Sequence, residues 1–349
     1  MNEEEKIKLF NDVFAPKPGE NILFLVDKPH GQISDNKKWK ERREMAKDWY
    51  ETFDNLGKNI GFSVKFLNYK ATGAQNRILS DEINDEINKS NLVIAMTEFS
   101  ATSTIMPICN KKNSKTRGAS MPMVEKRMET TAFKANYQDV KKYAYAIKKF
   151  LNNANKAKVS FSTGDELFID LRNRVGCVDA GDCTKYGQGI NFPSGEGFIA
   201  PYESYKDEIK EYGRSQTEGI LPVKYGKELV KYIIKNNKII DAIGDGQKAE
   251  EMKKFFKENN SRRNIAELGI GCNPKAIVTG NILEDEKVGL HIAYGMSSHI
   301  GGKIESDLHQ DIVYAKGCPV EGITLTLFNK DGSKTDLIKN SMLRYKLLQ

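Results

Sequence analysis

Histidine is scarce in this chain, and most of it is concentrated in one stretch. Of the four histidines, three lie within nineteen positions, namely His291, His299 and His309. His309 and Asp311 are two residues apart in a segment with strand character, so both side chains should project from one face toward the same point. An imidazole beside a carboxylate is a suitable pair of ligands for a divalent metal ion.

Three further side chains draw attention because of their surroundings. Glu267 lies in the middle of the apolar stretch NIAELGIG, and His291 lies in the short apolar stretch GLHIAYG. A carboxylate within an apolar strand is costly to bury unless it is paired, hydrogen-bonded or bound to a metal. Glu196, in NFPSGEGFIAP, occupies a Gly/Pro-rich segment where the backbone can approach a site closely. Together with His309 and Asp311, these residues predict a divalent-metal site in the C-terminal half.

Each of these residues also has an ordinary structural explanation. A single strand histidine such as His291 is often a core residue whose ring nitrogens are hydrogen-bonded. His309 and Asp311 can form a structural hydrogen-bonded pair, and Glu196 taken alone can be a solvated loop acid. The occurrence of several suitable residue types on neighbouring strands favours the metal interpretation over these separate explanations.

The N-terminal part of the chain alternates between strand and helix patterns. The apolar run at 21–26 predicts a buried parallel strand, 37–55 repeats apolar positions at helical spacing, and 63–69 alternates as a strand does. A helix near 79–89 then precedes another short apolar strand at 91–97. This order predicts an α/β, doubly wound, Rossmann-like domain.

After a predicted helix at 138–152, the sequence pattern changes to strands joined by hairpin turns, and we interpret this helix as the domain boundary. Hairpins are predicted around Thr163–Gly164–Asp165 and around Lys330–Asp331–Gly332, and a helix at 244–260 has Asp245 as its expected N-cap. The sequence therefore predicts two domains: the α/β domain at 1–152, and an α+β, strand-rich, metal-binding domain at 153–349.

Composition argues against several classes of function. Lys and Arg number 54 against 47 Asp and Glu, but the two signs are interspersed, which indicates a soluble protein and no nucleic-acid interface. The acidic N-terminus does not resemble a signal peptide, and no run approaches 18 apolar residues, so we expect a cytoplasmic protein that does not enter a membrane. The five cysteines form no CxxC pair, and nucleotide-binding glycine motifs are absent.

Several stretches resemble the aminopeptidase T-like metallopeptidases, also called the thermophilic metalloprotease family. AELGIGCNPKAIVTGNILEDEKVGLHIAYG and the following SSHIGGKIESDLHQDIVY are similar to its C-terminal half. GINFPSGEGFIAP resembles the segment that bears the family's first glutamate ligand, and NLVIAMTEFSATST with GASMP is similar to its N-terminal domain. The resemblance spans most of the chain, and its Glu…Glu…His…His-x-Asp pattern is fairly specific.

The resemblance implies a metallo-aminopeptidase, a hydrolase that removes N-terminal residues from peptides or cleaves a small amide, and acts as a homodimer. It implies two divalent ions, such as zinc, cobalt or manganese, with Glu196 or Glu267 doubling as general base. The five metal ligands that it implies are Glu196, Glu267, His291, His309 and Asp311.

One departure from the family concerns a tyrosine that follows the first histidine ligand in the peptidases. Ser298 stands near that place here, and Tyr294 is close but out of register. His299, in the glycine-bearing turn SSHIGG, is the candidate replacement, since a loop imidazole can donate to an oxyanion. A turn histidine satisfied by backbone groups is the alternative. Cys272, beside the strand of Glu267, is interpreted as a packing residue.

Two other functions use the same residues. His291, His309 and Asp311 would also form the two-histidine, one-carboxylate set of a single Fe(II). The superfamily resemblance extends to ring-cleaving dihydroxypyridine dioxygenases, but the presence of both Glu196 and Glu267 favours two metals. A non-catalytic protein that binds a small molecule or peptide is the third hypothesis. In either case a pocket could recruit Lys28, His30 and Glu98 from the ends of the N-terminal strands.

Overall fold

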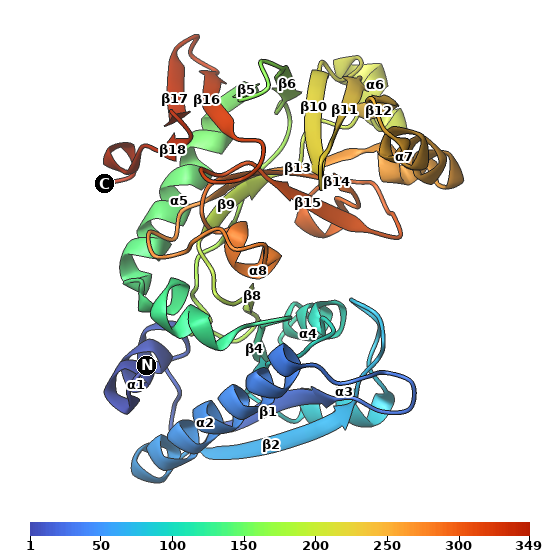
Figure 1. Ribbon diagram of the computed structural model, residues 1–349. Coiled ribbons are helices and arrows are strands. Elements are labelled where there is room, and N and C mark those ends of the chain that lie inside the picture. Colours follow the sequence, from blue (N-terminus) through green and yellow to red (C-terminus); the bar gives the residue numbers. More distant parts are fainter. The chain divides into compact units, whose positions relative to one another are not determined.

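The computed structural model describes all 349 residues, which form two compact units. The N-terminal unit consists of Met1–Lys141, Asp179–Ser194 and Asn273–Ile277, and the C-terminal unit consists of Lys142–Val178, Gly195–Cys272 and Val278–Gln349. Figure 1 shows the elements of each unit along the chain. None of the helices combines the length and the apolar character that crossing a bilayer requires.

The N-terminal unit contains a parallel five-stranded sheet in the order β2-β1-β3-β4-β8. A β1 strand with six consecutive buried residues suits a central position, because a parallel sheet is covered on both faces. The strands are β1 (Asn21–Lys28), β2 (Ser63–Lys70), β3 (Leu92–Ala95), β4 (Arg117–Ser120) and β8 (Gly189–Asn191). The helices of this region are α1 (Glu3–Val13), α2 (Lys37–Ile60), α3 (Asp81–Asn88) and α4 (Thr102–Cys109).

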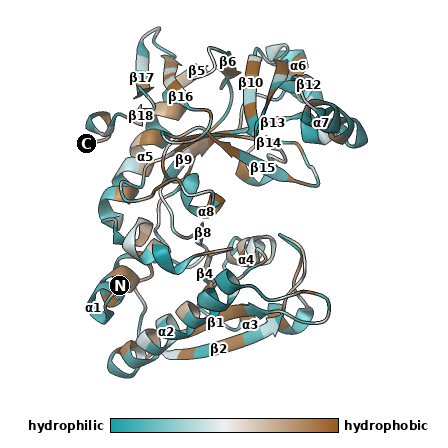
Figure 2. Cartoon of the chain, in the orientation of Figure 1, coloured by the Kyte–Doolittle hydropathy of each residue, from teal (hydrophilic) through white to brown (hydrophobic).

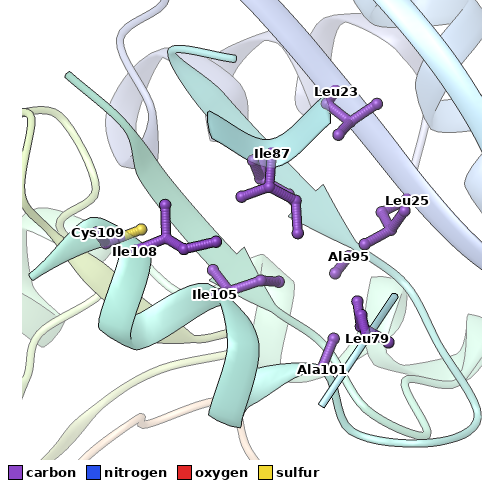
Figure 3. Packing of buried hydrophobic residues seen from close by; sticks show 10 residues of the cluster. Leu23, Leu25, Leu79, Ile87, Ala95, Ala101, Ile105, Ile108 and Cys109 are labelled. Carbon is purple, nitrogen blue, oxygen red and sulfur yellow. The ribbon is translucent and has the colours of Figure 1, made fainter. Parts of the chain in front are cut away.

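Helices cover both faces of this parallel sheet, as the sequence predicts for a doubly wound fold. On one face, Leu23 and Leu25 of β1 pack with Ile87 of α3 and Ile105 of α4, as Figure 3 shows. On the other face, the Phe24 ring lies 5.5 Å from the Phe53 ring of α2. Because adjacent residues of one strand point to opposite faces, β1 supplies both cores.

The C-terminal unit contains a sheet of eight antiparallel strands, which forms one of its two layers of strands. Both predicted hairpins are confirmed as β5–β6 and β16–β17. In spatial order the strands are β12 (Lys238–Ile243), β11 (Glu228–Lys235), β10 (Glu218–Tyr225), β6 (Glu166–Asp170), β5 (Ala154–Phe161), β16 (Gly322–Asn329), β17 (Lys334–Lys339) and β18 (Met342–Leu343).

A second sheet of five strands carries the chemistry-bearing residues of the C-terminal half. Its strands in spatial order are β15 (His309–Val313), β14 (Leu290–Gly295), β13 (Ile265–Gly271), β9 (Glu196–Ile199) and β7 (Cys177–Asp179). Every residue of β13 and β14 is buried, and Figure 2 shows hydrophobic colouring in this region. The remaining helices are α5 (Tyr137–Asn153), α6 (Lys206–Tyr212), α7 (Gln247–Glu258) and α8 (Ile282–Asp285).

The predicted N-cap of α7 was wrong. Gly246 is the capping residue, and Asp245 is exposed. A carboxylate from a neighbouring strand serves the helix terminus instead, because Glu228 Oε2 of β11 accepts a hydrogen bond from the Lys248 amide at 2.9 Å. Sequence-local capping rules could not identify a partner that tertiary packing brings in.

Candidate metal centre

The five candidate ligands come from four adjacent strands of the five-stranded sheet. Glu196 begins β9, Glu267 lies within β13, His291 lies on β14, and His309 and Asp311 lie on β15. The order β15-β14-β13-β9 places these strands side by side (Figure 1). Glu196, which the sequence alone could place in a solvated loop, is buried in a strand.

Strand register gathers the ligands on one face of this sheet. Glu196 is paired with Gly271 of β13, and His291 is paired with Gly269, two residues before Gly271 on the same strand. Ala293 stands between Glu267 on one side and Asp311 on the other. Since side chains alternate between faces, all these positions share one face. Small residues separate the larger acidic and imidazole side chains and leave room among them.

The ligand atoms form two groups that share one carboxylate. Glu196, Glu267 and His291 make the first group, and Glu267, His309 and Asp311 make the second. Within each group the ligand atoms lie within 4.8 Å of one another. We call them the Glu196 group and the Asp311 group. The shared residue is Glu267, which the sequence singled out as an acid in an apolar strand.

Both imidazoles present Nε2 to the carboxylates. His291 Nε2 lies 3.2 Å from Glu196 Oε2 and 3.3 Å from Glu267 Oε1, while His309 Nε2 lies 3.3 Å from Glu267 Oε2 and 3.4 Å from Asp311 Oδ1. The Nδ1 atom of His309 bonds to the Met296 carbonyl oxygen at 2.6 Å. A carbonyl at the second nitrogen fixes the ring orientation and the tautomer, as it does for metal-bound histidines.

Charge pairing determines protonation within these groups. Burial alone would raise the pKa of Glu267, but the His291 and His309 rings lower it to about 2. Burial would lower the pKa of His291, but Glu196 and Glu267 raise it well above its ordinary value. Burial would also lower the pKa of His309, but Asp311 and Glu267 raise it well above its ordinary value. The opposite shifts of the acids and the imidazoles have one cause, their mutual pairing, and any proton on Nε2 would have to leave before a divalent ion could bind there.

A buried lysine adjoins the Glu196 group. Lys287 Nζ donates to Glu196 Oε1 and to Glu286 Oε1, at 2.6 Å each. Burial alone would raise the pKa of Glu196, but Lys287 and then His291 bring it below its ordinary value. The pKa of Glu286 is raised to about 8, by burial first and also by the nearby Glu196 and Asp311 carboxylates. Sequence analysis did not single out Lys287 or Glu286, because neither departs from the charged stretch LEDEK.

Two glycines of β13 are further residues that sequence analysis passed over. A Cβ at Gly269 would overlap Nε2 of His291, so the imidazole lies directly over this glycine. A Cβ at Gly271 would overlap the backbone of Glu286 and Lys287. The alternation of Glu267, Gly269 and Gly271 was visible in ELGIG and indicates a strand face that another group approaches closely.

His299 lies beside the Asp311 group on a short turn, in which its own side chain is exposed. Its ring centroid is 4.8 Å from that of His309, with the rings nearly perpendicular. The turn, η4 (Ser298–Ile300), is anchored at both ends by the buried Glu203, which accepts hydrogen bonds from Ser297 Oγ and from the Lys303 amide.

The remaining candidates belong to neither ligand group. Tyr294 is on the opposite face of β14, where its ring lies 5.5 Å from that of Phe256. Cys272 is buried after the end of β13. In the N-terminal unit, His30 Nε2 lies 2.9 Å from the Ala71 carbonyl oxygen, and Glu98 pairs with Arg42. Lys28 ends β1 there.

The donor set suits a divalent cation. Each group combines one imidazole with two carboxylates, and every one of these side chains is at most 16% exposed. Imidazole and carboxylate are ligands of zinc, cobalt, manganese and iron, and three such protein ligands leave coordination positions open. The two groups are therefore possible metal-binding sites.

Solved structures share this fold over the full length of the chain. One is 2,5-dihydroxypyridine dioxygenase from Pseudomonas putida, with a TM-score of 0.66, 16% identity and coverage of 98% of both chains. Another is AmpT, an aminopeptidase T, from Thermus thermophilus, with a TM-score of 0.63, 11% identity and coverage of 98% of both chains. No family model and no curated protein sequence matches the chain. The N-terminal α/β sheet and strand-rich C-terminal sheets are those of AmpT, which confirms the predicted fold class.

Proposed function

We propose that the chain is a metal-dependent hydrolase that cleaves an N-terminal peptide bond or a small amide, using two divalent ions held by Glu196, Glu267, His291, His309 and Asp311. The observation that carries this proposal is the shared carboxylate, since Glu267 belongs to both ligand groups. A carboxylate shared by two adjacent ligand sets could help to hold two divalent ions near each other, as two-metal hydrolysis requires. The full-length likeness to AmpT supports the same activity.

The chain's own residues would divide the work as follows. A bound divalent ion supplies Lewis-acid polarisation of the carbonyl group and acidifies water. His309, oriented by the Met296 carbonyl, holds its Nε2 toward the centre. Glu196 or Glu267 would accept the proton of the attacking water and return it to the leaving amine nitrogen as the C–N bond breaks. His299, on its anchored turn beside His309, donates a hydrogen bond to the oxygen on which negative charge develops.

The test joins elemental analysis to peptidase assays. Protein purified without added metal is analysed for zinc, cobalt, manganese and iron, then stripped and reloaded with each ion. We expect release of the N-terminal residue from free peptides, no cleavage of N-acetylated peptides, and loss of both metal and activity in His309→Ala. Full metal occupancy in that variant, or a complete absence of hydrolysis by reloaded protein, would contradict the proposal.

A His299→Asn variant tests the proposed oxyanion donor. Because His299 belongs to neither ligand group, we expect unchanged metal content but kcat roughly 10²-fold lower. Gln310→Ala is the control, since Gln310 is exposed and lies on the face of β15 opposite to His309 and Asp311. Equal activity in the His299 variant and the control would remove His299 from the mechanism.

A ring-cleaving dioxygenase with a single Fe(II) is the second candidate function. It is favoured by the likeness to the Pseudomonas putida dioxygenase, whose TM-score exceeds that of AmpT. The ligands would be His291, His309 and Asp311, on the adjacent strands β14 and β15. Oxygen uptake with a dihydroxypyridine and Fe(II)-loaded protein, compared with anaerobic controls, decides between the two functions. We also propose a homodimer, which light scattering after size-exclusion chromatography tests.

A further inference from the structure

Lys287 brings a fixed positive charge to one side of the candidate centre. It lies between α8 and β14 and is fully buried, with its Nζ 2.6 Å from Glu196 Oε1. Transfer of an ammonium group out of water is costly unless a carboxylate compensates it, and here Glu196 pairs with the lysine while Glu286 accepts a second hydrogen bond from it. The lysine is therefore held in place by the fold, not by a mobile surface contact.

The two ligand groups differ in their relation to this charge. In the Glu196 group, Oε1 of Glu196 accepts from Lys287, and Oε2 faces His291 at 3.2 Å. In the Asp311 group, Asp311 pairs with His309 at 3.4 Å, and His309 pairs with Glu267 at 3.3 Å. A dication bound at the Glu196 group would share a carboxylate with an ammonium group. Like charges repel strongly at such separations in a buried site.

We propose that Lys287 makes the two metal sites unequal, so that the Asp311 group binds its ion tightly and the Glu196 group binds a second ion weakly. This inference rests on the proposed function, because it presupposes that the cluster binds divalent ions. The ammonium group neutralises part of the charge of Glu196 and repels the second dication. The enzyme would therefore hold one ion at low metal concentration and complete its centre only when metal is more abundant.

A hydrogen bond from Lys287 to Glu196 could instead strengthen metal binding, so the test distinguishes the effect of the charge from the effect of the hydrogen bond. Groups that hydrogen-bond to metal ligands usually strengthen metal binding by orienting those ligands. If Lys287 acts mainly in this way, removal of its side chain weakens binding. If its charge dominates, removal strengthens binding at the Glu196 group. Lys287→Gln removes the charge but keeps a donor group, whereas Lys287→Met removes both.

The experiment is a calorimetric titration of the metal-free full-length protein with Zn²⁺, repeated with Co²⁺ to follow ligand absorption bands. We expect the wild type to bind two ions in separate steps, and Lys287→Met and Lys287→Gln to strengthen only the second step, by roughly 10–100-fold. Lys339→Met, which removes an exposed lysine of β17, should leave both steps unchanged. Equal steps in the wild type, or an unchanged or weaker second step in both Lys287 variants, would overturn the inference.

A second pair of variants keeps the inference testable if the Lys287 variants do not fold. His309→Ala should remove the tight step, and His291→Ala should remove the weak step and spare the tight one. Loss of the tight step in His291→Ala would overturn the assignment. If wild-type protein binds no divalent ion at all, the proposed function fails as well. If it binds two ions with equal affinity, only the present inference fails.

Discussion

At the scale of single residues, the candidate centre depends on small residues between the ligands as much as on the ligands themselves. Gly269 lies beneath the His291 ring, and Ala293 separates Glu267 from Asp311 in the pairing of the strands. Acidic and imidazole groups converge on one sheet face because the positions between them are small. The requirement at Gly269 is steric, since a side chain there would occupy the place of the His291 ring.

Gly269→Ala should therefore damage the centre without removing any ligand. The added methyl group must displace the His291 ring, and we expect metal affinity to fall by roughly 10–100-fold. Overpacking should also lower the free energy of unfolding by about 1–3 kcal/mol. Metal titration and urea unfolding measure the two effects. Gly176→Ala is the control, because a Cβ there meets no atom closer than 3.3 Å. Equal metal affinity in both variants would show that the ring tolerates the methyl group.

At the scale of elements, antiparallel strands bring together residues that are distant in sequence. Glu196 and Lys287 are 91 residues apart, yet the pairing of β9 with β13 places Glu196 opposite Gly271, next to the backbone of Lys287. The same principle governs helix termini. The first turn of α7 receives its acceptor from Glu228 on β11, and the preceding loop residue Asp245 is exposed.

Substitutions at the start of α7 test this assignment. Glu228→Ala removes the acceptor of the Lys248 amide, so we expect a loss of about 1 kcal/mol in the free energy of unfolding. Asp245→Ala should change stability by less than about 0.5 kcal/mol, as surface substitutions usually do. Chemical denaturation of both variants measures the difference. A larger loss of unfolding free energy in the Asp245 variant would show that Asp245 is the N-cap after all, as the sequence predicted.

Periodicity predicted the elements well where local sequence determines them. The predicted strands at 21–26 and 63–69 are β1 and β2, and the His309-x-Asp311 spacing indicated a shared strand face. Periodicity could not predict contacts that depend on how strands pair in the fold. Lys287 lies in an ordinary charged stretch, and only the fold buries it against Glu196. The roles of the five ligands and of His299 stay predictions until metal is measured.

At the scale of the whole molecule, the fold buries ion pairs as well as apolar cores, and such a pair makes each partner hard to remove. In the N-terminal unit, Arg117 makes a two-pronged contact with Glu20, at 2.5 and 2.9 Å, and donates to the Cys183 and Phe14 carbonyl oxygens. Both Arg117 and Glu20 are buried. This network ties β4 to two loops that are remote in sequence.

Glu20→Gln should destabilise the protein by about 3–5 kcal/mol at pH 7, because it leaves the Arg117 charge buried without its partner. Burial alone would raise the pKa of Glu20, but Arg117 and the Lys17 amide bring it below its ordinary value. The stabilisation is therefore complete above the unfolded pKa of about 4.3 and is lost as the pH falls through the lower folded value.

Thermal or urea unfolding at pH 7 and at several values below pH 4.3 measures this dependence. The difference in the free energy of unfolding between wild type and Glu20→Gln should become smaller as the pH falls. Glu86→Gln is the control, since its pair with Lys65 lies at the surface and contributes little to stability. A gap that is independent of pH would show that the Glu20 charge is not the cause.

The anchoring of the turn that carries His299 bears on how a substrate would be received. Glu203 accepts from Ser297 Oγ and from the Lys303 amide, so one buried carboxylate fixes both ends of the segment. Its third partner, Asn264 Nδ2 at 2.9 Å, lies immediately before β13. The backbone that carries His299 is thus fixed beside His309 before any ligand arrives, and binding need not expend entropy on ordering this turn.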